Sequence, residues 1–422
     1  MSFEQRLQDV RSGFERPFWI ANISEIFERL AYYGAFASLA IYLHETLNFP
    51  TAQTGVLTGI FNGAVWFLAV FGGAVADRLG FRKALSLAYL ILGGAYFLLG
   101  SIGASWLAPV RNASPLWLFV TVILLLPSLG VALVKPCVVG TTARASQENV
   151  RSLGYSIYYT MVNIGGLLGP FAGSLARRYL GAGKIFLIAA AATFMMFFFV
   201  LAFFREPKRL DDAPIPTIGQ VLRNFLTVLG NPKFMIFLLI FSGYWIVFWQ
   251  QWIVMPVYLH QFVGKDIDVE RILMTNSIII ITCTIALNQL TKKLPAFTSI
   301  ILGTFITGIS WVILAIHPSM WAAIATIAVL AVGEIVHQPR YYEYVSRLAP
   351  EGQQGTYMGF AFVPLGIGSL VGGWFGGKTL HYFGETMNRP QWTWFVIVGI
   401  GLATTALLWI YDRIVRPETA SA

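Results

Sequence analysis

The sequence predicts an all-α integral membrane protein of twelve transmembrane helices, arranged as two repeats of six with both termini in the cytoplasm. Three observations support this fold class: the composition, the spacing of the apolar runs and an internal repeat. Of the 422 residues, 56% are hydrophobic and only 12% are charged, which is too apolar for a soluble protein of this length. We therefore expect the lipid bilayer to be the main surrounding of this chain.

Apolar runs of about 20 residues, the length that crosses about 30 Å of hydrocarbon, occur twelve times. They lie near 18–43, 53–76, 82–104, 115–138, 152–176, 184–204, 234–259, 272–291, 296–316, 319–343, 356–377 and 393–412. The polar connection between the sixth and seventh runs contains a short amphipathic stretch suited to a membrane surface. The predicted organisation is a six-helix bundle over 1–204, a cytoplasmic linker over 205–232 and a second bundle over 233–422.

The placement of the basic residues predicts the orientation. If the N-terminus is inside, most of the 29 Lys and Arg residues fall in the termini and the even-numbered connections, as cytoplasmic segments require. The connection between the fifth and sixth runs, with Arg177, Arg178 and Lys184, opposes this bias without reversing it. The net charge of +9 is thus a signal of topology, and we expect no nucleic-acid partner.

The internal repeat joins the fourth run to the tenth. Four residues recur at one offset of 203: Gly130, Pro136, Arg144 and Glu148 return as Gly333, Pro339, Arg347 and Glu351. Parallel repeats of six spans with a central cytoplasmic loop are typical of secondary transporters, in which the substrate site lies between the halves at mid-membrane.

Charged residues interrupt the first apolar run in the stretch EIFERLAYYG. Glu25, Glu28 and Arg29 are related by three and four positions, so a helix places all three on one face. Charge at this depth costs several kcal/mol unless it is paired or solvated, which predicts an inward-facing polar cluster. The alternative is an ion pair that only holds helices together, although such a pair does not need two acids beside one base.

The connection between the second and third runs reads GGAVADRLGFRKA. Gly73 permits a close helix approach and Gly80 permits a tight turn. Asp77, which lies between them, can pair with a base and so favour one conformation of the protein. The matching residues of this conformational motif are Gly73, Asp77, Arg78, Gly80, Arg82 and Lys83. The stretch resembles the GxxxDRxGRRxx motif of the major facilitator superfamily, which implies that fold.

Several further stretches resemble motifs of the proton-coupled oligopeptide transporter family. EIFERLAYYG is similar to its ExxERFxYYG motif, GVALVKPCVVG places Lys135 on a membrane-embedded lysine of its fourth span, and IYYTMVNIGGLLGP is similar to its fifth-span signature. Shorter matches, such as Gly333-Glu334, lie in the second half. The family positions that bind substrate fall on Arg29, Tyr32, Tyr33, Trp66, Lys135, Tyr158, Asn163, Asn276 and Glu334.

The resemblance implies that Lys135 pairs with Glu25 and Glu28 and that protonation there is coupled to substrate binding, with Arg29 completing the proton-coupling set. A zwitterionic peptide would meet bases in the first half and Glu334 in the second. Departures from the family pattern are Trp66 in place of a second-span tyrosine, the stretch 248–252 in place of a seventh-span acid, an eleventh span without its tryptophan, and the absence of an extra helical pair between the halves.

Two other groups of residues each allow two interpretations. His337, Arg340 and Glu343 either gate a cytoplasmic exit or reach the interface with their long side chains, and the second is the stronger expectation. Trp245, Trp249 and Trp252 share one helical face and form either a cavity-lining aromatic wall or a lipid-facing or packing stripe. Cys137 and Cys283 lie within apolar runs, so neither a disulfide framework nor a metal site is expected.

The sequence therefore predicts a monomeric proton-coupled symporter of di- or tripeptides, or of peptide-like solutes, in a bacterial cytoplasmic membrane. The alternative keeps the fold and the proton switch but moves another small molecule, for example by exporting a drug. A receptor or scaffold without transport is a further class, in which Glu28→Gln and Lys135→Ala would leave function intact. No motif of an enzyme is present, and no cofactor other than the coupling proton is expected.

Overall fold

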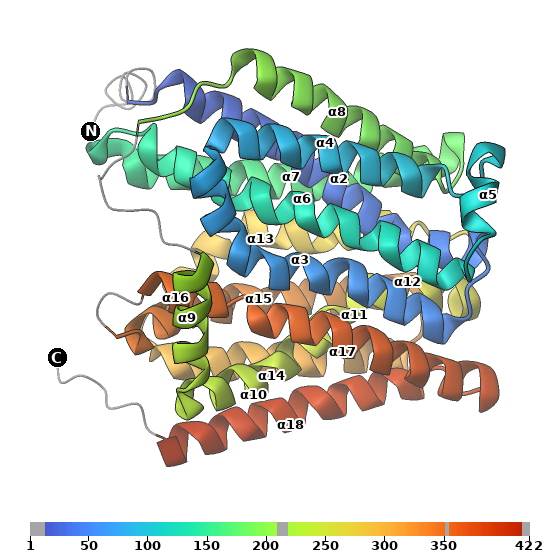
Figure 1. Ribbon diagram of the computed structural model, residues 1–422. Helices are drawn as coiled ribbons and strands as arrows, with labels where there is room; N and C mark the ends of the chain where they lie inside the picture. Colours follow the sequence, from blue (N-terminus) through green and yellow to red (C-terminus); the bar gives the residue numbers. More distant parts are fainter. Residues whose placement is uncertain (1–12, 209–217, 351–353, 416–422) are drawn as a thin grey trace. The chain divides into compact units, whose positions relative to one another are not determined.

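The computed structural model describes residues 13–208, 218–350 and 354–415, and over these residues the chain is almost wholly helical (Figure 1). The first long helices are α2 (Arg16–Ile41), α3 (Thr51–Leu79), α4 (Phe81–Gly100), α6 (Leu116–Arg144), α7 (Arg151–Leu180) and α8 (Lys184–Phe203). Next come α9 (Ile218–Leu229), α10 (Pro232–Phe248), α11 (Gln250–Ile253), α12 (Met255–Tyr258), α13 (Val269–Thr291) and α14 (Ala296–Ile316). The last are α15 (Met320–Leu348), α16 (Gln354–Phe360), α17 (Val363–Leu380) and α18 (Trp392–Val415).

Short helical turns fill several connections. They are η2 (Ser105–Leu107), α5 (Ala108–Arg111) and η3 (Glu148–Val150), together with three π-helical turns, η1 (Tyr42–Thr46), η4 (Leu259–Val263) and η5 (His381–Thr386). Within the described ranges the β-structure is limited to one isolated bridge between Phe14 and Ser146. The expectation of an all-helical protein is confirmed.

Nine helices among the described residues are long and apolar enough to cross a bilayer, and α3 raises the number to ten if its two parts, Thr51–Ala69 and Phe71–Leu79, count as one span. The chain is thus a multi-pass membrane protein. A helix or an interrupted helix covers each of the twelve predicted runs. The helices α2 and α7 are long enough, with 26 and 30 residues, but their polar residues keep them outside the nine.

The chain divides into two compact units, and neither is continuous in sequence. Unit 1 is Met1–Ser38 with Leu68–Val221, and unit 2 is Leu39–Phe67 with Leu222–Ala422. The end of α2 and the first part of α3 therefore belong with the later helices. The predicted bundles over 1–204 and 233–422 divide the chain by sequence order, and they stay a prediction.

In unit 1, α4 lies beside both α8 and α6 (Figure 1). The end of α3 comes close to α6 at Gly72, where a Cβ atom would meet the Ala132 carbonyl oxygen at 1.8 Å. That carbonyl lacks its usual donor four residues on, because Pro136 has no N–H. A glycine on α3 therefore lets the two backbones meet where α6 is locally weakened, three positions before Lys135.

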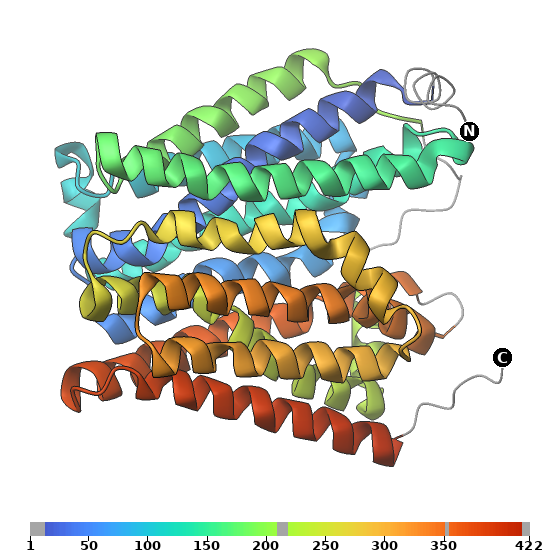
Figure 2. The same ribbon diagram turned by 180° about the vertical axis from the view of Figure 1, so that it is seen from behind.

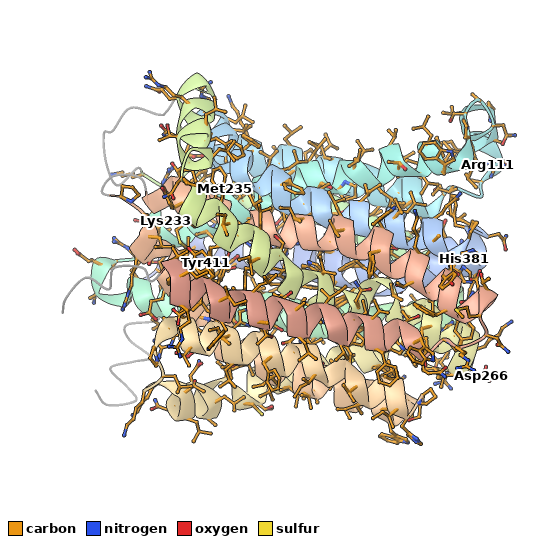
Figure 3. All side chains as sticks on the ribbon, turned by 90° about the horizontal axis from the view of Figure 1, so that it is seen from below. Arg111, Lys233, Met235, Asp266, His381 and Tyr411 are labelled. Carbon is orange, nitrogen blue, oxygen red and sulfur yellow. The ribbon has the colours of Figure 1, made fainter. Side chains whose placement is uncertain are left out.

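In unit 2, α14 packs against α15 and α18, and α10 packs against α17 and α18 (Figure 2). The first part of α3 packs on α17 through glycines: a Cβ at Gly55 would meet the Gly373 carbonyl at 2.4 Å, and one at Gly59 would meet the Ser369 carbonyl at 2.6 Å. Spacings of four between small residues let helix backbones touch in this way. At one end of unit 2 the Tyr411 hydroxyl donates to the Lys233 carbonyl at 3.0 Å (Figure 3).

Two of the predicted spans of unit 2 are interrupted. The run expected at 234–259 is broken at Trp249 and Val254 into α10, α11 and α12, and Pro256 deprives a further carbonyl of its donor. The run expected at 356–377 is broken between α16 and α17 just before Pro364. Both runs still count as candidate membrane spans, over Pro232–Ile253 and Thr356–Thr386. The predicted linker contains α9, and residues 209–217 lie outside the described part of the chain.

Candidate functional site

The charged cluster predicted on the first span lies on α2 and is buried. Glu25 and Glu28 are each 1% exposed and Arg29 is 7% exposed. The Arg29 Nε atom donates to Glu28 Oε2 and lies 3.4 Å from Glu25 Oε1. One guanidinium nitrogen thus serves both carboxylates: Glu25, at the predicted spacing of four residues, and Glu28, the direct neighbour of Arg29.

Several polar atoms of this cluster have no hydrogen-bond partner among the described residues. They are Glu25 Oε2, Glu28 Oε1 and Arg29 Nη2, all on α2, together with the Tyr96 hydroxyl on α4. Leaving a buried polar group unpaired costs about 1–3 kcal/mol, and more for a charged group. The cluster is thus built from strong donors and acceptors with spare capacity, which is what a site that exchanges a proton or a polar ligand requires.

Close contact between α2 and α7 holds the cluster in place. A Cβ atom at Gly165 of α7 would meet the Arg29 Cβ at 2.4 Å, and one at Gly169 would meet the Leu30 carbonyl oxygen and the Gly34 nitrogen at 2.8 Å. Gly165 and Gly169 are four residues apart, so both face α2. The fifth-span signature seen in the sequence therefore contains the surface on which Arg29 rests.

Lys135, on α6, interacts electrostatically with Glu25, Glu28 and Arg29. The prediction that this lysine accompanies the first-span acids is consistent with that arrangement, and its role stays a prediction. With both carboxylates ionised, the two acids and two bases are formally neutral as a group. Adding one proton would leave a net positive charge and free one base from its partner.

Aromatic side chains surround the cluster. The Arg29 guanidinium carbon lies 5.2 Å from the Tyr32 ring centre, and Tyr32 meets Tyr33 edge to face at 5.4 Å. Tyr158 of α7 interacts electrostatically with Glu25 and Arg29. Asn163 of α7 instead donates to the Tyr159 carbonyl of its own helix at 2.8 Å, so its amide does not join the charges.

Sequence reasoning missed two members of this environment. Tyr89 and Tyr96 on α4 are fully buried and interact electrostatically with Glu25 and Glu28, respectively. They are seven residues apart, so one face of α4 presents both. Nothing in the sequence distinguishes a tyrosine inside an apolar run from its neighbours. The only available signal was the spacing of seven residues between the two tyrosines.

The conformational motif forms a network at the junction of α3 and α4. Asp77 pairs with Arg144 at the end of α6 (Nη2 to Oδ1, 2.8 Å), and the Arg144 guanidinium carbon lies 4.0 Å from the Phe81 ring centre. Gly80 has a φ of 79°, which favours glycine, and provides the tight turn that was predicted. The predicted base partner of Asp77 is therefore Arg144.

Glu206 completes this network and was not foreseen. Its two carboxylate oxygens accept hydrogen bonds from the Phe81 and Arg82 backbone nitrogens at 2.7 and 2.8 Å. Gly80, at the N-cap of α4, has no side chain to do so. The Arg82 guanidinium also donates to the Leu201 carbonyl at 2.7 Å, so the end of α8 is attached to the start of α4 at two points.

In unit 2 the structure brings two predicted site residues together. The Asn276 amide on α13 donates to Glu334 Oε2 on α15 at 3.0 Å. Trp66 lies elsewhere in the same unit: its indole nitrogen donates to Asn62 Oδ1 at 3.2 Å, and its ring lies 5.7 Å from Phe362 and 6.2 Å from Trp249. It therefore belongs to an aromatic group beside the two interrupted helices.

The stretch that replaces the expected seventh-span acid is buried. Gln250 is fully buried and donates to the Ile246 and Gly372 carbonyls at 2.7 and 3.2 Å, so a neutral amide bridges α10 and α17 here. Trp249 donates from its indole nitrogen to the Leu365 carbonyl at 3.0 Å. Trp245, Trp249 and Trp252 are 3–6% exposed, which favours the packing interpretation of this stripe.

The predicted cluster of His337, Arg340 and Glu343 separates into two parts. His337 is fully buried and lies 4.2 Å from the Tyr244 ring, whereas Glu343 accepts from Arg340 at 2.8 Å and from Arg347 at 2.6 Å near the end of α15. The Arg340 and Glu343 side chains are 27% and 30% exposed, in keeping with the expectation that they reach an interface.

The sequence model of the Major Facilitator Superfamily matches residues 22–363 and 268–422, which together cover nearly the whole chain. The chain belongs to the Major Facilitator Superfamily. This membership confirms the superfamily predicted from the motif at the junction of α3 and α4 and the expectation of a transporter instead of an enzyme.

The curated relatives and the solved structures that resemble this chain carry names of three kinds. Multidrug resistance protein MdtH of Cronobacter sakazakii is 23% identical over 382 residues, 90% of each chain, and that of Yersinia pestis is 23% identical over 393 residues, 91% of this chain and 92% of the other. A POT family transporter solved with a thioalcohol-conjugated peptide has a TM-score of 0.78 at 16% identity, over 96% of this chain and 97% of the other. The nucleoside transporter NupG also reaches 0.78, at 13% identity, over 93% and 99%. These structural likenesses show the fold alone.

Proposed function

We propose that this protein is a proton-coupled secondary transporter whose proton switch is the cluster of Glu25, Glu28 and Arg29 on α2 with Lys135 on α6. The observation that carries the proposal is that the two acids share one guanidinium nitrogen while Glu25 Oε2 and Glu28 Oε1, both buried, find no hydrogen-bond partner in the described part of the chain. Protonating either acid weakens its hold on Arg29 and Lys135, which then become available to a substrate carboxylate. No cofactor takes part in this proposal.

The proposed cargo is a di- or tripeptide, or a solute with the same separation of charges. Its carboxylate would bind the bases on α2 and α6, with Tyr32, Tyr33, Tyr158 and Asn163 as further polar contacts. Glu334, which Asn276 positions, is the acid proposed to accept an ammonium group. The matches of α2, α6 and α7 to the oligopeptide transporter motifs support this cargo. Trp66 is proposed to contact the substrate through its ring.

A second candidate is export of an amphipathic drug through the same proton switch. The observation that favours it is that the curated relatives named above are multidrug resistance proteins aligned over about nine tenths of the chain. The aromatic group of Trp66, Trp249 and Phe362 also suits an apolar ring better than a peptide backbone. Both candidates use the acids of α2, and they differ in cargo and direction.

We further propose that α2 and α7 cross the bilayer with the other ten spans, which gives twelve spans in two repeats of six with both termini in the cytoplasm of a bacterial cell. The buried charges of α2 and its glycine contacts with α7 explain why these two helices are less apolar than lipid-facing ones. The proposed unit of function is the monomer in the cytoplasmic membrane.

The test is uptake of labelled dialanine into proteoliposomes with and without an inward proton gradient, comparing the wild type with Lys135→Ala and Glu28→Gln. We expect gradient-dependent accumulation in the wild type and a loss of at least tenfold in both variants, because each removes one member of the switch. Lys184→Ala, at the exposed first residue of α8, is the matched control and should transport normally.

The same vesicles, loaded with lipophilic cationic dyes, measure the second candidate. Gradient-driven dye movement that is lost in Lys135→Ala, together with no dialanine uptake, would replace peptide by drug as cargo and keep the switch. Normal transport of any cargo by both Lys135→Ala and Glu28→Gln would refute the switch itself.

A further inference from the structure

A second group of titratable side chains lies in unit 2, away from the residues used above. The three π-helical turns η1, η4 and η5 each contribute a histidine, and with the start of α3 they form what we call the π-turn network: His44, Glu45, Thr51, His260, Gln261, His381 and Glu385. Figure 3 shows Asp266 and His381 at one end of unit 2, opposite Lys233 and Tyr411. The network therefore lies at the end remote from the start of α10.

The bonds of His260 require a proton. Its Nδ1 atom lies 2.7 Å from Glu45 Oε1 and its Nε2 atom lies 2.9 Å from the Ile267 carbonyl oxygen. A carbonyl only accepts, so Nε2 must carry hydrogen, and a carboxylate also only accepts, so Nδ1 can bond to Glu45 only if a second hydrogen lies between them. The pair therefore holds one proton more than a neutral histidine and an ionised glutamate.

Because His260 is buried, the shared proton affects the stability of the contact between His260 and Glu45. The His260 side chain is 2% exposed, whereas Glu45 is 43% exposed and can exchange protons with water. Without the shared proton, a lone pair of His260 Nδ1 would face a lone pair of Glu45 Oε1 at 2.7 Å. The buried ring has little access to water that could bond to Nδ1 instead. The contact between η1 and η4 is thus stable only in its protonated form.

The rest of the network is satisfied without further protons. His44 bonds to the Phe49 carbonyl through Nδ1 at 2.9 Å and receives the Gln261 amide at Nε2 at 2.7 Å, as a neutral ring does. Glu385 accepts from the Thr51 hydroxyl and from His381 Nδ1 (2.6 Å). Other charged groups on the surrounding elements are Lys265, Asp266, Asp268, Glu270, Arg271, Lys378 and Arg389, of which Asp268 and Arg271 pair at 3.1 Å.

We propose that the π-turn network is a proton-dependent latch, which ties the end of α2 and the start of α3 to η4 and η5 while His260 and Glu45 share one proton and lets them separate when that proton leaves. The latch connects parts of the chain that are distant in sequence. It joins the first two long helices to elements that follow two hundred and more residues later. The inference needs only membership of a transporter superfamily and not the proposed cargo or the α2 switch.

The sign of the pH dependence follows from proton counting. The closed latch binds one more proton than the separated pair, so the closed fraction is high at acidic pH and falls as pH rises. Release of one proton lowers the ratio of closed to open by up to about tenfold per pH unit.

The test measures distance instead of transport. Spin labels on Thr46→Cys and Lys265→Cys, both exposed and flanking the latch, report its opening by pulsed electron paramagnetic resonance in nanodiscs between pH 6 and 9. The background carries Cys137→Ala and Cys283→Ala, which removes the two native thiols. We expect a short distance at pH 6 and a growing longer component toward pH 9.

Glu45→Gln is the decisive variant, because a glutamine amide can donate to Nδ1 of a neutral His260. It should stay closed over the whole range, whereas His260→Gln, which cannot titrate, should show a distance distribution independent of pH. His317→Gln, on an exposed histidine outside the network, is the control and should follow the wild type. A wild-type distance that does not change with pH, or a Glu45→Gln variant that follows the wild-type curve, would overturn the proposal. Size-exclusion profiles establish that each variant is folded.

Discussion

At the scale of single residues, Glu206 shows how a side chain far along the chain can finish a helix. The turn at Gly80 reverses the chain between α3 and α4, but glycine leaves the first N–H groups of α4 without a capping side chain. Glu206 accepts from two of them and also places a negative charge at the positive end of the helix. The turn and its cap thus come from segments more than 120 residues apart.

Replacing Glu206 by alanine should therefore destabilise the folded protein by about 1 kcal/mol, the usual cost of losing an N-cap, without touching the α2 cluster. Thermal unfolding in detergent, followed by tryptophan fluorescence, measures the change. Glu148→Ala, on an exposed residue of η3, is the control and should unfold near the wild-type temperature. An unaltered unfolding temperature for Glu206→Ala would show that water replaces the carboxylate at no cost.

The residues of the candidate site differ in how far the sequence could predict them. Glu25, Glu28 and Arg29 were predictable because their relation is local and a helix fixes it. The Asn276–Glu334 contact was anticipated only as two separate matches to a family pattern. Tyr96 and Glu206 could not be found, because their importance depends on which helix packs beside them, and no local period encodes that.

At the scale of elements, the contact between α2 and α7 decides whether the cluster keeps its shape. Gly165 lies against Arg29 and Gly169 against Gly34, so a side chain on this face of α7 must push the two helices apart. The sequence indicated the glycines through the fifth-span signature but not which helix they touch. It also could not reveal the interruptions at Trp249 and before Pro364, because an interrupted apolar run has the same composition as a continuous one.

Gly165→Ala should cost about 1–3 kcal/mol of stability, as overpacking of a close contact does, and should also impair transport by displacing Arg29. Gly94→Ala on α4 is the matched control, since a Cβ there has nothing within 4 Å and alanine favours the helix. Unfolding temperature and initial transport rate, measured on both variants, separate the two effects. Equal behaviour of the two alanine variants would contradict the close approach.

At the scale of the whole molecule, apolarity alone under-counts the spans if, as proposed, α2 and α7 cross the bilayer. These two long helices carry the charged cluster and the glycine surface on which it rests, and neither is among the nine or ten apolar spans of the described residues. A helix that faces a polar interior contains fewer apolar residues, so its composition does not identify it as a span. The fold was predictable because the remaining apolar runs fix the order of the membrane crossings. The grouping of Leu39–Phe67 with the later helices was not predictable, because it depends on tertiary contacts.

Single cysteines on either side of α7 test the topology, in the background without native thiols. If α7 crosses the bilayer, Asn149→Cys should react with a membrane-impermeant maleimide only after cells are opened, and Lys184→Cys should react in intact cells. Both positions are exposed, so access to the reagent is limited by the membrane. Reaction of both cysteines from the same side would exclude α7 as a span and, with it, the twelve-span topology.

The two buried bonding patterns of the π-turn network set opposite demands on acidity. His260 needs its extra proton, whereas His44 must stay neutral, because a proton on its Nε2 atom would face the donor amide of Gln261 unless that amide turned over and gave up its bonds to Thr51 and Glu385. The closed network therefore holds one added proton between His260 and Glu45 and none on Nε2 of His44. A single histidine type thus serves two opposite bonding roles within one turn network, set only by whether its partner is a carboxylate or an amide donor.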